Sequence, residues 1–146
     1  MEKRININTT EPQAYKAMYA LEGFLAQSQL SKTLKQLIKI RASQINKCAF
    51  CIDMHTKKAL KDGETQQRIF LLDAWRETTL FTEEERAALA MTEEITLIHE
   101  QGLSSDTYHN ALQVFNENQI AQIIMTIVTI NGWNRIAVST HLELGA

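Results

Sequence analysis

The sequence predicts an all-α protein that forms a single domain over residues 1–146, and three observations support this prediction. Its 146 residues are 45% hydrophobic and 22% charged, which suits one compact core. One proline and five glycines leave little of the turn chemistry that a multi-stranded sheet needs. Apolar residues recur at helical spacing along most of the chain, and no linker, internal repeat or low-complexity tract divides it.

The first helix is expected to begin after Thr10 and to run to about Gln27. Either Thr9 or Thr10 can cap this helix, and Pro12 falls in its first turn, where a missing amide hydrogen costs nothing. The chain before it, residues 1–8, is expected to be a short arm. Three aromatic side chains are expected to form the core face of this helix: Tyr15, Tyr19 and Phe24.

Ser31 can cap a second helix that is expected to end near Asn46, with Lys35 and Lys39 facing solvent. A third helix is expected from near Cys48 to residue 61, because Gly63 can supply the left-handed conformation that ends many helices. The two cysteines of the chain would therefore lie at the start of a helix.

Four more helical segments are expected in the second half of the chain. Thr82 and Glu85 have the spacing of a capping box, in which each side chain binds the backbone amide of the other residue. Asn116 can cap the last segment, which is apolar on more than one face and is therefore expected to be a central or interface helix. The four segments are expected at residues 64–75, 82–102, 104–115 and 119–142.

Charge and hydropathy exclude several classes of partner. A net charge of −2 without a basic stripe argues against nucleic acid. The longest apolar stretch, residues 120–130, is shorter than the about 20 residues that cross a bilayer. Residues 1–8 carry no apolar segment of the kind found in secretion signals, and two cysteines are too few for a secreted disulfide framework. We therefore expect a cytoplasmic protein with no membrane or nucleic-acid partner.

Cys48 and Cys51 stand three positions apart, and His55 follows one helical turn later, so the three side chains would share one helix face. Unpaired amide hydrogens at a helix start stabilise thiolate over thiol, and can lower a cysteine pKa from about 8.5 to roughly 3.5–7.5. His55 could accept a proton or stabilise the thiolate as imidazolium. This pattern favours a redox-active dithiol.

The spacing leaves two other interpretations open. The cysteines could be a buried structural pair, because cysteine behaves as a small hydrophobe. They could also hold zinc together with His55, although a structural zinc site normally needs four ligands. The remaining histidines show no ligand spacing and are expected to be surface or structural residues: His99, His109 and His141.

Residues 37–55, which contain both cysteines and His55, resemble the core of the alkylhydroperoxidase D-like (AhpD-like) family. This family is the peroxidase-related branch of the carboxymuconolactone decarboxylase superfamily. Residues 81–90 and 130–135 resemble later segments of such proteins, so the resemblance covers roughly residues 15–140. Decarboxylase activity is the least favoured alternative, because superfamily members with that activity generally lack this dithiol.

The resemblance implies an antioxidant enzyme that reduces hydroperoxides, in the manner of a peroxiredoxin, or exchanges reducing equivalents as a disulfide reductase. By position, Cys51 would attack the peroxide, Cys48 would resolve the sulfenic acid into a disulfide, and His55 would belong to the proton relay. The family also implies an all-α homo-oligomer, often a trimer or hexamer. The electrons would come from a thioredoxin-like or lipoyl-bearing partner, with no bound cofactor or metal.

The sequence departs from the family at two positions of the relay. Gln36 stands where the family has a glutamate that acts through water on the histidine, and Phe50 replaces a further histidine. Gln36 cannot take a proton, but it can orient a water or hold His55. Loss of general-base assistance typically costs about 10²–10⁴-fold in rate, so slow peroxidase turnover or a shift to disulfide exchange is expected.

Three further polar or aromatic residues near these segments are expected to have structural roles. Asp53 lies next to the dithiol in sequence but on another helix face, so a solvated position or a basic neighbour is expected. Trp133 and Arg135 are expected to serve packing or subunit contacts rather than catalysis.

Overall fold

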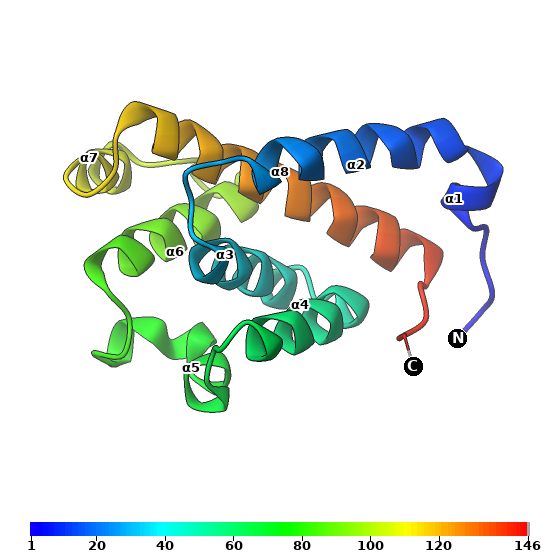
Figure 1. Ribbon diagram of the computed structural model, residues 1–146, viewed down its shortest axis with the longest axis horizontal. Coiled ribbons are helices and arrows are strands. Elements are labelled where there is room, and N and C mark those ends of the chain that lie inside the picture. Colours follow the sequence, from blue (N-terminus) through cyan, green and yellow to red (C-terminus); the bar gives the residue numbers. More distant parts are fainter. Residues whose placement is uncertain (146) are drawn as a thin grey trace.

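The computed structural model describes residues 1–145, and within that range every regular element is helical, as predicted. None of these helices has the length and hydropathy that spanning a bilayer requires. Eight α-helices and one 3₁₀ helix follow one another along the chain (Figure 1). They are α1 (Ile7–Thr10), α2 (Pro12–Ala26), α3 (Lys32–Ile45), α4 (Ala49–Lys61), α5 (Gln66–Phe70), the 3₁₀ helix η1 (Leu72–Glu77), α6 (Glu83–Thr96), α7 (Ser105–Leu112) and α8 (Glu117–Thr140).

Helix α3 is the centre of the molecule, with α4, α6 and α8 packed around it (Figure 1). Its apolar residues point in two directions. Ile38 packs into a cluster formed with α6, α7 and α8, whereas Leu37 and Ile40 pack into a second cluster with α4, α5, η1 and α6. All three side chains have 0% exposure, so α3 is buried on both sides. A helix held on two sides is a rigid support for the loop that follows it.

Three predicted helix starts are confirmed by their caps, whereas the threonine cap expected for the first helix is wrong, because Glu11 is the N-cap of α2 and its side chain forms no cap hydrogen bond. The Ser31 hydroxyl accepts a hydrogen bond from the Leu34 amide at 3.1 Å. Thr82 and Glu85 form the predicted capping box, and Asn116 forms another at the start of α8. Each cap satisfies amide hydrogens that have no partner inside the helix. Short polar side chains therefore place the helix starts independently of distant contacts.

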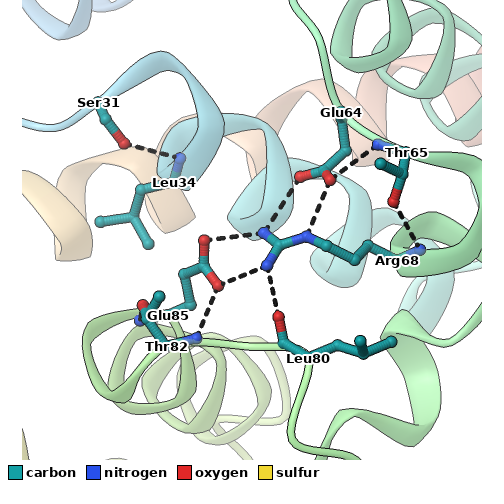
Figure 2. A network of polar contacts seen from close by, with 8 residues as sticks. All are labelled: Ser31, Leu34, Glu64, Thr65, Arg68, Leu80, Thr82 and Glu85. Atoms are coloured by element: carbon teal, nitrogen blue, oxygen red, sulfur yellow. Dashed lines mark hydrogen bonds and ion pairs between the residues drawn. The ribbon is translucent and has the colours of Figure 1, made fainter.

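Arg68 connects the start of α5 to the start of α6 (Figure 2). Its guanidinium forms ion pairs with Glu64 at 2.9 Å and Glu85 at 2.8 Å, and donates to the Leu80 carbonyl oxygen at 2.6 Å. These hydrogen bonds to two carboxylates raise the pKa of Arg68 above its ordinary value. Glu85 also caps α6, so one largely buried network fixes the loop around the Thr82 cap.

Three predicted boundaries are wrong. The segment expected as one helix over residues 64–75 divides into α5 and η1, with Ala74 outside helical φ/ψ values. Arg86 donates to the carbonyl oxygens of Trp75 and Thr78, so tertiary bonds replace those of a continuing helix. Helix α6 ends at Thr96 rather than near residue 102, and α7 ends at Leu112 rather than at residue 115.

The expected exposure of α2 and α3 also needs correction. Tyr19 is 58% exposed and Phe24 is 50% exposed, because α2 lies on the outside of the molecule and buries only Leu25. Lys39, expected in solvent, is buried with 7% exposure. It lies beneath α2, where its ammonium pairs with the Glu22 carboxylate at 3.0 Å. The arm at residues 1–8 includes the start of α1.

Candidate active site

The turn between α3 and α4 presents both cysteines. Lys47 adopts a left-handed conformation with φ of 55°, and the Cys48 amide donates to the Ser43 carbonyl oxygen at 3.0 Å. Cys48 is the N-cap of α4, and its Sγ accepts a hydrogen bond from the Cys51 amide at 3.3 Å. The prediction that the cysteines lie at a helix start is therefore confirmed.

The Cys48 and Cys51 sulfurs are joined as a disulfide, with their Cα atoms 5.3 Å apart. The prediction that the two side chains can meet is thereby confirmed. Both residues are buried, with exposures of 1% and 2%. They pack against Ala137 of α8, and Phe50 and Leu142 cover this cluster from outside. Cys51 lines a cavity, whereas Cys48 lies behind it.

His55 lies one turn beyond Cys51 and contacts Gln36 of α3 directly. The Nδ1 atom is 2.9 Å from Oε1 of Gln36. An amide oxygen only accepts, so Nδ1 carries the proton and Nε2 is left as the basic nitrogen. Burial is the main cause that lowers the pKa of His55 to about 3, and the ammonium groups of Lys39 and Lys58 contribute to the same shift. At neutral pH the ring is therefore uncharged.

The depressed pKa of His55 predicts a specific pH dependence of stability. In the unfolded chain the ring binds a proton near its ordinary pKa of 6.5, whereas in the folded protein it stays neutral to about pH 3. The neutral form stabilises the fold fully above pH 6.5, and this stabilisation is lost as the pH falls toward 3. At pH 5 the free energy of unfolding should be about 2 kcal/mol lower than at pH 8 from this group alone.

Urea unfolding of the oxidised protein at pH 8, 6 and 5 measures this effect. The matched variant is His55→Gln, which keeps a polar side chain but has no titrating ring. Its unfolding free energy should vary much less over this range, since the other three histidines are common to both proteins. Parallel pH profiles for the two proteins would contradict the assignment to His55.

The cavity beside Cys51 has a volume of about 340 Å³ and lies among α2, α3, α4 and α8. Much of its wall is apolar or aromatic. Its polar groups lie mainly on α3 and α4. The apolar and aromatic lining residues are Tyr15, Tyr19, Phe50, Met54, Trp133, Ile136, Ala137 and Leu142, and the others are Glu22, Gln36, Lys39, Cys51, His55 and Lys58. A sulfur, an imidazole and an amide thus meet in one site of the size that small molecules occupy.

Sequence reasoning missed Glu22, Lys39 and Lys58 as residues of this site. Glu22 receives hydrogen bonds from the Lys39 ammonium at 3.0 Å and from the Trp133 indole at 3.1 Å, which draws α2, α3 and α8 together. Lys58 follows Cys51 and His55 at helical spacing, so periodicity along α4 could have identified it on their face. The Glu22–Lys39 pair joins two helices that are separate in sequence, so no short sequence pattern predicts it.

Other residues singled out from the sequence lie away from the cavity. Asp53 pairs with Lys57 at 2.9 Å, which confirms the expected basic neighbour. Arg135 donates to Asn131 one turn earlier in α8. His99 and His109 are exposed, as expected, and His141 is half-buried. Within residues 1–145, no group of three or more histidine, cysteine, aspartate or glutamate side chains has an arrangement that would hold a metal ion.

Comparisons with known proteins agree with this fold. The model of the carboxymuconolactone decarboxylase family matches residues 12–94. The uncharacterized protein YdfG of Bacillus subtilis is 42% identical over 139 residues, which cover 95% of each chain. A crystal structure from Agrobacterium tumefaciens, of a protein of unknown function named as a candidate antioxidant defence protein AhpD, has a TM-score of 0.95 and 41% identity over 99% of each chain.

A more distant structure has the same fold. It is an uncharacterized peroxidase-related protein from Silicibacter, with a TM-score of 0.80 and 24% identity. The match covers 90% of this chain and 70% of that one.

Proposed function

Because the chain belongs to the carboxymuconolactone decarboxylase family and has the AhpD-like fold, we propose that it is an antioxidant oxidoreductase that works through the Cys48–Cys51 dithiol. Its proposed activity is thiol-dependent reduction of hydroperoxides, with disulfide exchange through the same two sulfurs. The observation that carries the proposal is the position of Cys51 in a cavity wall beside His55, with Cys48 bonded to it from behind.

The first step of the proposed cycle uses reduced Cys51. His55 takes the thiol proton, as a weak base because of its low pKa, and the thiolate attacks the terminal oxygen of R–O–O–H. An S–O bond forms and the O–O bond breaks, which leaves Cys51 as a sulfenic acid and releases RO⁻. His55 returns the proton to RO⁻ and gives the alcohol ROH. The position of Cys51 in the cavity wall supports this step, since a peroxide in the cavity can reach its sulfur.

Cys48 then attacks the Cys51 sulfur. The S–S bond forms, and hydroxide leaves and combines with the Cys48 thiol proton to give water. The Cα–Cα distance of 5.3 Å supports this step because the bond needs no displacement of the helix start. A thioredoxin-like or lipoyl-bearing dithiol would then return two electrons and two protons.

The test is the rate of cysteine oxidation. The reduced protein is mixed with cumene hydroperoxide, and free thiols are titrated at intervals, with the unfolded chain in denaturant as control. Folded Cys51 should oxidise much faster than the unfolded thiols, and one alcohol should appear for each dithiol lost. If the folded cysteines react no faster than the unfolded ones, the peroxidase proposal fails.

The same preparation addresses the zinc-holding alternative. Stoichiometric zinc in the purified reduced protein, with unfolding when a chelator is added, would favour a structural metal site instead. The expected homo-oligomer remains a prediction, which sedimentation of the purified chain would test. The cytoplasmic location and the identity of the electron donor remain predictions as well.

A further inference from the structure

The cavity beside Cys51 combines an apolar body with a positively charged mouth. We propose that it selects apolar ligands that carry a carboxylate, and, resting on the proposed function, that the substrates are organic hydroperoxides bearing that group. The apolar wall would hold the body of the ligand. The ammonium of Lys58 would hold the carboxylate at the mouth.

Much of the apolar part of the site comes from α4 and α8, and Tyr15 and Tyr19 of α2 add aromatic surface. Phe50, Met54, Trp133 and Ile136 line the cavity, and such a wall excludes water from whatever fills it. Peroxide itself is too small and too polar to need this surface. An apolar wall favours binding only when the ligand buries apolar surface against it. The site therefore favours a hydroperoxide with a hydrocarbon or aromatic body.

The charges around the cavity are mostly positive. Glu22 is the one carboxylate in the cavity lining within the described residues, and Lys39 already pairs with it at 3.0 Å. Lys58 has only a loose partner, Asp62, at 4.0 Å. Lys35 lies outside the lining and donates to the Leu25 carbonyl oxygen at 2.9 Å, so the lining itself carries two ammonium groups and one carboxylate. An anionic ligand would relieve this excess of positive charge.

Lys58 is well placed to hold such an anion. It lines the cavity, yet 57% of its side chain is exposed, so the ammonium lies at the mouth rather than inside. It also acts electrostatically on His55, which places it within range of the reacting groups. A ligand with its carboxylate on Lys58 can extend its apolar body over the wall toward Cys51. Lysine serves as a point charge here, which suits a single carboxylate.

The first experiment measures binding without turnover. The probes are para-carboxy cumyl alcohol and its para-carboxamide analogue, which are stable product analogues of equal size and different charge. Quenching of tryptophan fluorescence in the oxidised protein gives each Kd, because Trp133 lines the cavity. The carboxylate should bind about fivefold more tightly than the carboxamide, and the difference should shrink as salt is added.

The variant Lys58→Gln should bring the two dissociation constants together. The matched control is Lys57→Gln, because Lys57 is the adjacent residue of α4, is 60% exposed and pairs with Asp53 outside the cavity. Lys57→Gln should leave the preference for the carboxylate unchanged. Equal binding of both alcohols to the unmodified protein, or loss of the preference in both variants alike, would overturn the proposal.

The second experiment measures turnover with para-carboxy cumene hydroperoxide and its carboxamide. Each kcat/KM is divided by the rate of the same peroxide with free dithiothreitol, which removes differences in intrinsic reactivity. The carboxylate should be favoured about fivefold, and Lys58→Gln should abolish this preference. If neither peroxide is consumed but the carboxylate alcohol still binds preferentially through Lys58, the peroxidase function fails while the ligand selectivity stands.

Discussion

Replacing Cys51 with serine is expected to abolish hydroperoxide consumption, down to the rate of buffer alone. Serine keeps the size of the side chain, but its hydroxyl does not ionise near neutral pH and cannot reduce the O–O bond. Among the described residues that line the cavity, the other sulfur belongs to Met54. Its thioether has no proton to lose and cannot form a thiolate. The measurement is loss of cumene hydroperoxide in the presence of a dithiol donor.

Cys48→Ser is the matched variant, since it removes the other sulfur of the same disulfide. It should still react once with peroxide, because Cys51 and His55 are intact. The sulfenic acid then has no resolving thiol and should persist, detectable by mass spectrometry after trapping with dimedone. Equal residual turnover in Cys51→Ser and Cys48→Ser would contradict the separate roles assigned to the two sulfurs.

Replacing His55 with glutamine should slow peroxide reduction by about 10²-fold while both thiols remain titratable, since general acid–base assistance is typically worth about 10²–10⁴-fold. Glutamine can still hydrogen-bond to Gln36 but cannot carry the proton from Cys51 to the leaving oxygen. The measurement is kcat/KM from pH 5 to pH 9. If the rate and the pH profile are unchanged, His55 is not in the relay.

The converse variant, Gln36→Glu, tests the same relay by strengthening it. Gln36 Oε1 lies 2.9 Å from His55 Nδ1, so a carboxylate there would raise the low pKa of the imidazole and make Nε2 a better base. Peroxide reduction at neutral pH should become about tenfold faster. The variant Gln44→Glu, at a half-buried position outside the cavity, is the control and should leave the rate unchanged.

Local chemistry explains which parts of the fold could be predicted from the sequence. Ser31, Thr82 and Asn116 form caps with residues three positions away, so four-residue patterns were enough. Helix ends depend on more distant bonds. Glu94 near the end of α6 accepts hydrogen bonds from Ser104, which turns the chain back before the helical pattern runs out.

In the candidate site too, the residues on one helix face could be predicted, whereas those brought in by packing between helices could not. Cys48, Cys51 and His55 share a helix face, so their spacing predicted the dithiol and its neighbour. Lys39 was expected in solvent because nothing in α3 shows that α2 would lie above it. Its burial depends on Glu22, which is seventeen residues away and on another helix. The charges around the cavity therefore depend on how the helices pack together, which the periodicity of one helix does not predict.

The capping role of Cys48 has a consequence for the direction of electron flow. Its sulfur accepts the Cys51 amide hydrogen at the start of α4, and an ionised sulfur accepts such a bond more strongly than a neutral one. The helix start therefore stabilises the reduced form, which raises the reduction potential of the pair. It also makes Cys48 the better leaving group when an incoming dithiol attacks Cys51. In the proposed cycle, the helix start that holds the disulfide therefore also favours its reduction by an external dithiol donor.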